Sequence, residues 1–263
     1  MRVLLTNDDG IMADGLYALY REFEGGADVT IVAPSEERSA VGHAITMSDP
    51  LRVDKVRRDG KFYGFAVKGM PADCVKIATS ALLSEMPDLL VSGVNPGANI
   101  GIDVIYSGTV SAATEGGLLG IPSIAVSVDA FQGGDYAYAA RFARHLAGIV
   151  LARGIPRGVA LNCNVPNLPP DKIKGIAVTA QSGCRYVEEF HERTDPRGRT
   201  YYWLDGYRTE FATDDESDVA ALMAGYITIM PIQADLTAHG FLSELGGWEL
   251  SLPEERHTRR KDG

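Results

Sequence analysis

The chain has 263 residues, of which 45% are hydrophobic and 23% are charged, proportions that are ordinary for a globular protein. Its 25 Lys and Arg residues stand against 35 Asp and Glu residues, and the formal net charge of −10 excludes a broad positive surface for duplex nucleic acid. An acidic protein that acts on an anionic substrate must supply positive charge locally, through a cation, a few side chains or helix N-termini.

The cysteines and the first residues indicate where the protein works. Cys74, Cys163 and Cys184 are far apart and form no C-x-x-C pair, which is typical of reduced thiols in a cytosol. The N-terminus turns polar after a few apolar residues, so we expect it to be a strand and not a signal peptide or membrane anchor. The sequence therefore predicts a cytoplasmic protein with no membrane contact.

Strands and helices alternate along the first 162 residues. The expected strands are 2–6, 29–32, 51–56, 62–67, 88–92, 123–128 and 159–162. The expected helices are one that carries Leu16, Leu19, Tyr20 and Phe23 and ends at Gly25-Gly26, and then 72–83, 109–119 and 136–153. This alternation predicts an α/β fold with a mostly parallel sheet and helices on both faces.

The pattern changes beyond about residue 176. Two strands, 184–190 and 200–204, flank the polar segment 191–199 and predict an extended β-hairpin arm over about residues 182–211. A helix at 214–223 with acidic residues at its start and a strand at 226–232 follow, and the charged tail from Glu254 is expected to fray. Since no repeat or linker is visible, we expect residues 1–263 to form a single domain.

The segment Thr6-Asn7-Asp8-Asp9-Gly10 directly follows the first strand. In an open α/β sheet, ligands bind in the crevice beyond the carboxyl ends of the strands. Two adjacent carboxylates there repel each other unless solvent or a cation lies between them, and a chain that turns at Gly10 can aim both at one point. The alternative is a helix start in which an Asp acts as N-cap.

Polar loops follow two further strands and begin one helix. Ser39 lies in the loop after the second strand, and Asn95 and Asn99 lie in a loop with three glycines, which suits a backbone close to a ligand. Ser107, Gly108 and Thr109 begin a helix, where free N–H groups and the dipole favour a phosphate. Each pattern alone also fits a plain turn or an N-cap. Their convergence on one rim favours a ligand site.

These motifs, in this order and spacing, resemble the SurE, or survival protein E, nucleotidases. The segments that match are TNDDG at 6–10, APSEERSAVGHAIT at 33–46, KGMPADCVKIA at 68–78, VSGVNPGANIG at 91–101 and YSGTVSAATEG at 106–116, and the resemblance extends over essentially the whole chain. It implies a Rossmann-like N-terminal part and one divalent cation per subunit, held by Asp8, Asp9, Ser39 and Asn95. It also implies 5′-nucleotide substrates, with room for side activity on 3′-nucleotides or polyphosphate, and a homodimer or homotetramer formed through the arm and the C-terminal segment.

The chemistry of these residues agrees with a hard cation. Carboxylate, hydroxyl and amide oxygens suit Mg²⁺ or Mn²⁺, whereas zinc would call for His and Cys. The hypothesis is metal-assisted hydrolysis of a phosphate ester, with Asp8, Asp9 and Asn95 as catalytic residues and Asp8 as the first choice to contact the attacking water. Asn99 and the Ser107-Gly108-Thr109 turn would bind the remaining phosphoryl oxygens.

Two nearby residues stand outside the set of ligands in this hypothesis. His43 lies in the Ser39 loop, where it either touches substrate or has a structural or solvent-exposed role. Cys74 lies in an apolar helix pattern that predicts a core position.

Other functions fit the sequence less well. A covalent aspartyl-phosphate route would call for D-x-D, but here the two carboxylates are adjacent. A dinucleotide-dependent dehydrogenase would need G-x-G-x-x-G and an acidic residue where Pro34 closes the second strand. The alternative from another class is a non-catalytic nucleotide-binding or assembly module. Aromatic residues on the arm fit an oligomer interface, and they are Tyr186, Phe190, Tyr201, Tyr202 and Trp203.

Overall fold

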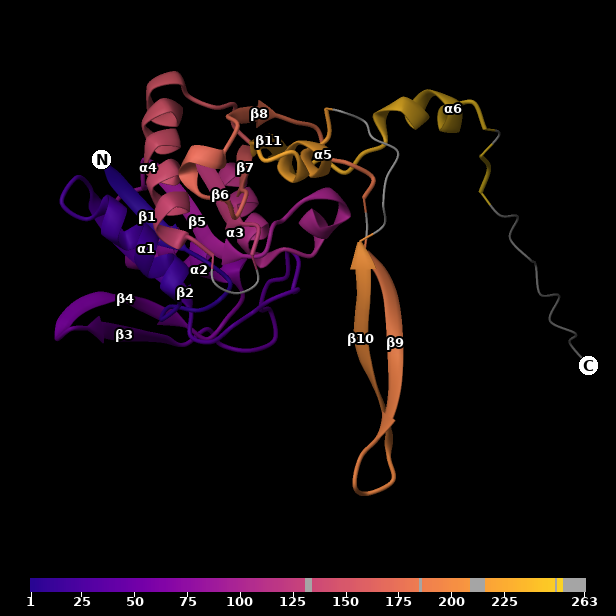
Figure 1. Cartoon of the computed structure of the whole chain (residues 1–263), viewed down its shortest axis with the longest axis horizontal. Coiled ribbons are helices and arrows are strands. Elements are labelled where there is room, and N and C mark those ends of the chain that lie inside the picture. The colour runs from indigo at the N-terminus through magenta and orange to yellow at the C-terminus, as the bar shows by residue number, and fades with distance from the viewer. Residues whose placement is uncertain (131–133, 185, 209–215, 249, 253–263) are drawn as a thin grey trace, which may run out of the picture.

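The computed structural model describes residues 1–130, 134–184, 186–208, 216–248 and 250–252, and these form one sheet of nine strands and a separate two-stranded ribbon (Figure 1). The order of the nine strands is β3-β4-β2-β1-β5-β6-β7-β11-β8. Their bounds are β1 Arg2–Thr6, β2 Asp28–Pro34, β3 Val53–Arg58, β4 Lys61–Val67, β5 Leu89–Pro96, β6 Ser123–Val128, β7 Val159–Val165, β8 Ile176–Val178 and β11 Ile227–Gln233. The helices are α1 Asp14–Phe23, α2 Pro71–Ile77, α3 Gly108–Leu118, α4 Tyr136–Arg153, α5 Asp218–Met223 and α6 Leu242–Gly246.

Helices cover both faces of the sheet, as the sequence predicts. Successive side chains of a strand point to opposite faces, and in β1 Val3 and Leu5 join the core beneath α1 and α4, while Leu4 joins the core beneath α2 and α3. Cys74 is fully buried in the second of these cores, which confirms its expected core position. The α/β class with a mostly parallel sheet is therefore confirmed.

The order of the strands places a crevice beside β1. This strand pairs in parallel with β2 on one side and β5 on the other, so the chain leaves β1 in one direction and later returns to its opposite side. Helix α1 packs closely over this point, and position 15 has room only for glycine, since an added Cβ there would overlap the carbonyl oxygen of Val94. Such a switch in strand order is the usual place for a ligand in an open α/β sheet.

Several expected boundaries are wrong. Strand β5 continues to Pro96, through the residues expected to form a loop, with a register shift between Ser92 and Asn95 that lets a glycine-containing strand bend. The helix expected at 72–83 starts at Pro71 and changes after Ile77 into a π-helical turn, Ala78–Leu82. The helix expected at 214–223 begins only at Asp218, because the Ser217 side chain caps it by accepting from the N–H of Ala220. Residues 214 and 215 lie outside the described residues.

The expected hairpin arm is present and is longer than its apolar pattern suggests. Strands β9 (Tyr186–Thr194) and β10 (Thr200–Arg208) pair antiparallel, so residues 191–194 of the expected polar segment belong to β9 and only 195–199 form the connecting turn. In Figure 1 the arm projects from the body of the molecule, and the segment that carries α6 also extends away from that body. The end of the predicted arm at 209–211, the side chain of Tyr186 and the charged tail from Glu254 lie outside the described residues. No helix in the described part of the chain is long and apolar enough to span a bilayer.

Candidate active site

A cavity of about 500 Å³ opens where the segments at the carboxyl ends of β1, β2 and β5 meet the start of α3. Six of the residues predicted to form the site line it: Asp8, Asp9, Ser39, Asn95, Asn99 and Ser107. These residues come from four separate segments of the sequence. The predicted convergence of the polar loops on one rim is therefore what the fold produces.

The loop after β1 is a turn in its own right and not the start of a helix. The Asn7 side chain donates to the carbonyl oxygen of Gly10 at 3.0 Å, and Gly10 has a φ of +101°, a conformation that favours glycine. Helix α1 begins four residues later, with Ala13 at its N-cap position. The alternative in which Asp8 or Asp9 caps α1 is therefore excluded.

Asp8 is held against the start of α3. The Thr109 hydroxyl donates a hydrogen bond to Oδ1 of Asp8, and a Cβ at Gly108 would lie 2.7 Å from the Cβ of Asp8. The helix can approach this closely only because position 108 has no side chain. Burial raises the pKa of the Asp8 carboxyl, and the hydrogen bond from Thr109 opposes that shift.

Asp9 has a carboxylate oxygen that calls for a ligand. Its Oδ2 is buried and has no hydrogen-bond partner among the described residues. Burial, together with the negative charges of Asp8 and Glu37, raises the pKa of Asp9 to about 7. A buried, unpaired carboxylate beside like charges is unfavourable, and a small dication in contact with both Asp8 and Asp9 would turn their repulsion into attraction. The donor set therefore fits a hard divalent cation.

Ser39 and Asn95 can complete such a shell. The Ser39 hydroxyl donates to Oε1 of Glu37 at 2.7 Å, which leaves its oxygen lone pairs for a cation. The Asn95 amide nitrogen donates to the carbonyl oxygens of Pro96 and Gly97, at 3.1 and 2.7 Å, and so its own carbonyl oxygen is the atom that remains for a ligand. In the described residues no three His, Cys, Asp or Glu side chains could hold a metal ion, so a cation here depends on these two neutral donors.

Asn99 is fixed by its backbone. Its backbone carbonyl oxygen accepts from the side-chain amides of Asn162 and Asn164 on β7, at 2.8 and 3.1 Å, and its backbone N–H donates to Oδ1 of Asn164 at 2.8 Å. The side-chain nitrogen Nδ2 of Asn99 donates to the Ser127 hydroxyl at 2.8 Å. Ser107 is the N-cap of α3, since its Oγ accepts from the N–H of Val110 at 3.1 Å. Both side chains line the cavity, and their proposed contact with phosphate stays a prediction.

Thr109 has a different environment from the one expected of a phosphate ligand. Its side chain is fully buried, it does not line the cavity, and its hydroxyl is used by Asp8. The geometry therefore makes Thr109 a positioning residue for Asp8. The sequence reasoning also missed Glu37 and Asp103, which line the cavity. Glu37 stands two residues before Ser39 in the same loop, and that proximity was the available signal.

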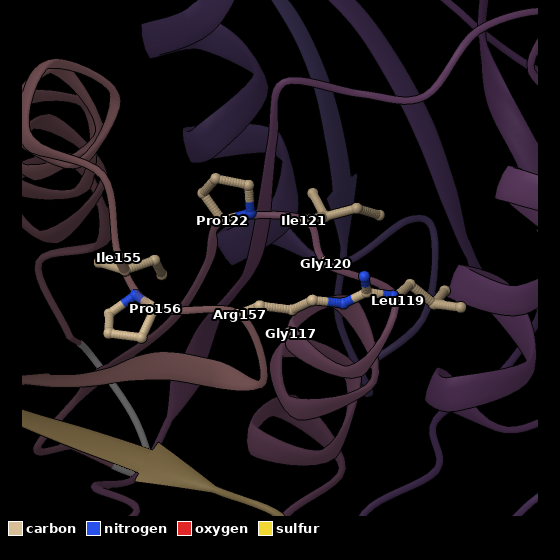
Figure 2. A pocket seen from close by; sticks show the side chains of 8 residues that line it. All are labelled: Gly117, Leu119, Gly120, Ile121, Pro122, Ile155, Pro156 and Arg157. Carbon is tan, nitrogen blue, oxygen red and sulfur yellow. The ribbon is translucent and has the colours of Figure 1, made fainter.

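A separate cavity of about 220 Å³ lies at the opposite end of the strands, near the amino ends of β6 and β7 (Figure 2). It is lined by backbone and apolar side chains such as Pro122 and Ile155, with Arg157 as the one charged group among its described lining residues. Without a carboxylate or a set of oxygen donors, it offers no comparable chemistry.

Comparisons with known proteins give matches over most of the chain. The sequence profile described as survival protein SurE matches residues 3–188. A curated 5′-nucleotidase SurE from Syntrophobacter fumaroxidans is 53% identical over 250 residues, which cover 95% of this chain and 100% of that protein. The chain belongs to the SurE family. A second 5′-nucleotidase SurE, from Syntrophus aciditrophicus, is 54% identical over 247 residues, which cover 93% of this chain and 92% of the relative.

The fold of this SurE chain is also that of a solved relative. The crystal structure of SurE from Aquifex aeolicus superposes with a TM-score of 0.81 at 37% sequence identity, covering 93% of this chain and 98% of the other. The matched profile span contains every residue that lines the cavity around Asp8 and Asp9, while β10, α5 and β11 lie beyond it.

Proposed function

We propose that this SurE chain is a metal-dependent 5′-nucleotidase, which hydrolyses nucleoside 5′-monophosphates to nucleoside and phosphate in the cavity around Asp8 and Asp9. One observation carries the proposal: two adjacent carboxylates, one with a buried oxygen that lacks a partner, share a cavity with the hydroxyl of Ser39 and the amide of Asn95. The relatives named 5′-nucleotidase support the same activity and disfavour a purely non-catalytic module.

The cation site would consist of Asp8, Asp9, Ser39 and Asn95, with one Mg²⁺ or Mn²⁺ per subunit. All four are oxygen donors of the kind that both ions prefer. When bound, the cation supplies charge neutralisation at the phosphate oxygens and lowers the pKa of water. The four side chains therefore have to be held at fixed positions. For Asp8, the hydrogen bond from Thr109 and the close approach of Gly108 provide this restraint.

The protein itself positions the substrate. Asn99, Ser107 and the backbone N–H of Gly108 at the start of α3 would bind the phosphoryl oxygens, because a helix N-terminus favours an anion. We propose Asp8 as the residue that also contacts the attacking water. Phosphoryl transfer depends mainly on positioning and charge stabilisation, so this arrangement needs no His or Cys nucleophile.

The test is to measure phosphate release from AMP and GMP by Asp8→Asn and Asp9→Asn, with Mg²⁺ and Mn²⁺ in turn. A metal contributes several kcal/mol of transition-state stabilisation, so each variant should lower kcat/KM by about 100-fold or more, and a chelator should abolish the wild-type activity. Asp28→Asn is the matched control, since Asp28 is exposed at the opposite end of β2. Wild-type turnover in both site variants would end the metal hypothesis.

We also propose a homodimer or homotetramer that assembles through the arm and the C-terminal segment. Phe190 and Trp203 on the arm are 64% and 60% exposed, and Trp248 and Leu250 in the C-terminal segment are 53% and 73% exposed. Exposed aromatic and large aliphatic side chains of this kind are typical of interface cores. Light scattering should give a multiple of 28.3 kDa for the wild type, and Trp203→Ser should lower the mass or the stability of the assembly. A monomeric wild type at micromolar concentration would contradict this assembly.

We expect the enzyme to work in the cytoplasm. The buried thiols of Cys74 and Cys163 fit a reducing compartment.

A further inference from the structure

Three buried side chains hold Asn99 at the edge of the candidate active site. Two of them are Asn162 and Asn164 on β7, whose side-chain amides fix the backbone of Asn99 through three hydrogen bonds. The third is Ser127 on β6, whose hydroxyl accepts from Nδ2 of Asn99 at 2.8 Å. Both the backbone and the side chain of Asn99 are therefore held in place.

These side chains belong to a row of polar residues across the sheet. Ser127 pairs in register with Asn95 of β5 on one side and with Asn164 of β7 on the other. Residues paired in register point to the same face of a sheet, so this row lies on one face at the carboxyl ends of the three strands. Nearer the amino ends, Ala125 and Ala160 of the same face belong to the apolar core beneath α2 and α3. The polar row therefore lies at the edge of the sheet that carries the cavity.

The burial of these groups has a cost in stability. Ser127 and Asn162 are fully buried, and Oδ1 of Asn162 has no hydrogen-bond partner among the described residues. An unpaired buried amide oxygen is unfavourable, and replacing both partners of a buried hydrogen bond by apolar groups of the same shape is often nearly neutral. An apolar row would therefore serve the stability of the fold about as well. The fixed position of Asn99 is the property that such a row would lose.

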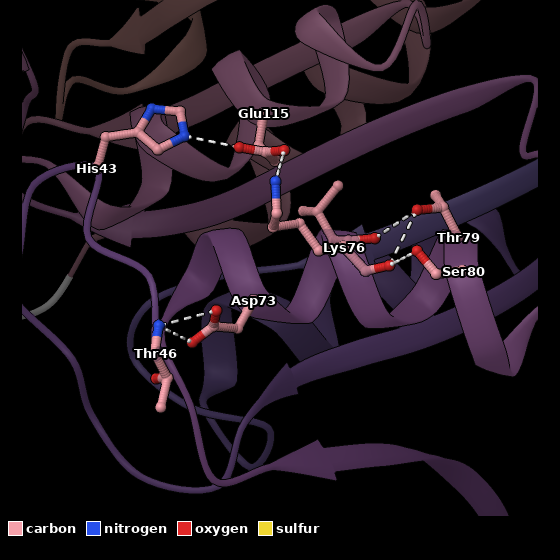
Figure 3. A network of polar contacts seen from close by, with 8 residues as sticks. His43, Thr46, Asp73, Lys76, Thr79, Ser80 and Glu115 are labelled. Carbon is pink, nitrogen blue, oxygen red and sulfur yellow. Dashed lines mark hydrogen bonds and ion pairs between the residues drawn. The ribbon is translucent and has the colours of Figure 1, made fainter. Parts of the chain in front are cut away.

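The loop after β2, which also reaches the cavity, is held in a different way. Nε2 of His43 lies 2.9 Å from Oε2 of Glu115 (Figure 3). The N–H of Thr46 donates to the Asp73 carboxylate at 3.1 Å (Figure 3). Both of these anchors are carboxylates, whereas Asn99 is held by a hydroxyl and two amides. A carboxylate beside Asn99 would repel a phosphate group, so neutral anchors hold this residue without opposing the binding of an anion.

We propose that Ser127, Asn162 and Asn164 are positioning residues for phosphate binding, and that they act by fixing Asn99. This inference rests on the proposed 5′-nucleotidase function, in which Asn99 contacts the phosphoryl group. An amide nitrogen carries two hydrogens, so the bond from Asn99 to Ser127 leaves the second hydrogen for a phosphoryl oxygen. None of the three anchors is among the described residues that line the cavity, so they act on the substrate through Asn99. A donor that is already held in place loses little conformational freedom on binding and keeps its position as charge develops on the phosphate.

The test compares two serines of the same strand. Ser127→Ala removes the hydroxyl that holds the Asn99 side chain. Ser123→Ala is the matched control, because Ser123 is also fully buried but lies at the amino end of β6, where its hydroxyl donates to the carbonyl oxygen of Ile121 at 2.8 Å. Ser127→Cys keeps the volume of the side chain but accepts a hydrogen bond only weakly, so it replaces the alanine variant if that variant does not fold.

The expected loss concerns phosphate and not the metal. Ser127→Ala should lower kcat/KM for AMP and weaken competitive inhibition by inorganic phosphate, each by about tenfold, which is less than the roughly 100-fold cost of a displacement of about 1 Å. Calorimetric titration with Mg²⁺ should give the wild-type affinity in both variants, because all four predicted cation ligands are intact. Ser123→Ala should keep the wild-type kinetics, even where its midpoint in urea falls as far as that of Ser127→Ala.

A double-mutant cycle separates positioning from general stability. If Ser127 acts through Asn99, Ser127→Ala should lower kcat/KM little further in the Asn99→Ala background, whereas independent effects would add. Additive losses, or wild-type kinetics and phosphate inhibition in a folded Ser127→Ala, would overturn the proposal while the proposed function stands. A wild type that releases no phosphate from AMP would instead refute the proposed function. Calorimetric titration of the Mg²⁺-loaded wild type and Ser127→Ala with phosphate then decides the present proposal, since equal affinities would overturn it.

Discussion

Replacing Gly108 by alanine should displace Asp8 and lower the rate of AMP hydrolysis without removing any predicted cation ligand. The new Cβ would lie 2.7 Å from the Cβ of Asp8 and 2.8 Å from its Oδ2. Two carbon atoms in favourable contact are about 3.5–4.0 Å apart, so the helix and the carboxylate would have to separate by about 1 Å. A displacement of about 1 Å in a catalytic group costs about 100-fold in rate, and we expect a loss of that size in kcat/KM for AMP.

Gly148→Ala is the control, because Gly148 lies inside α4 and a Cβ there meets no atom within 4 Å. That variant should keep full activity and gain about 0.5–1 kcal/mol in stability, the usual benefit of alanine over glycine in a helix. Phosphate release with saturating Mg²⁺ would be measured beside the melting temperature and calorimetric titration of the metal. If Gly108→Ala stays folded and hydrolyses AMP at the wild-type rate, Asp8 does not need the position that the structure gives it.

Three further outcomes can be tested by unfolding and labelling. The hydrogen bond from His43 lowers the pKa of Glu115, although burial opposes that shift. The Glu115 carboxylate therefore stabilises the folded protein fully above the pKa that Glu115 has in the unfolded chain, and this stabilisation is lost as the pH falls through the lower pKa of the folded protein. Glu115→Gln should therefore cost about 1–3 kcal/mol at pH 7 in urea unfolding and less in acid; an equal cost at both pH values would contradict this. Asp218 is fully buried and accepts from backbone N–H groups of two distant segments, so Asp218→Asn should lower the free energy of unfolding by about 2–3 kcal/mol, and an unchanged midpoint would count against that role. Burial raises the pKa of the Cys74 thiol, and it raises that of Cys163 to about 12. Neither thiol should therefore react with a disulfide reagent at pH 8 until denaturant is added, and rapid labelling of either residue in the native protein would refute its burial.

The parts of the fold that depend on local sequence patterns could be predicted from the sequence. The apolar run of β1 followed by two carboxylates and a glycine indicates both the strand and the crevice beyond it, because parallel strands end at the same edge. Boundaries set by tertiary contacts could not be predicted. Strand β5 continues past Gly93 because β6 pairs with it beyond a register shift, and α5 begins at Asp218 because Ser217 caps it.

The candidate site divides in the same way. Its polar loops are visible in the sequence as motifs, but the use of the Thr109 hydroxyl by Asp8 depends on how α3 meets the β1 loop, two segments a hundred residues apart. The neighbouring cavity of about 600 Å³ could be predicted only in part: His43 and Ser107, which line it, stand in motifs, but most of its lining residues do not. Its walls bring together residues such as Ile105, Gln181 and Met230, which are apolar or neutral and carry no motif. Only their placement in space brings them into one cavity.

The two cavities draw on different lengths of the chain. Every residue around the carboxylate pair lies before position 110, whereas much of the neighbouring apolar wall comes from 179–181 and 230–236, on and around β8 and β11 at the far edge of the sheet. The cavity around Asp8 and Asp9 is therefore built from the first part of the chain alone, whereas the adjoining cavity of about 600 Å³ also needs the later segments. Changes in those later segments would alter the shape of the adjoining cavity and leave every residue that lines the cavity around Asp8 and Asp9 in place.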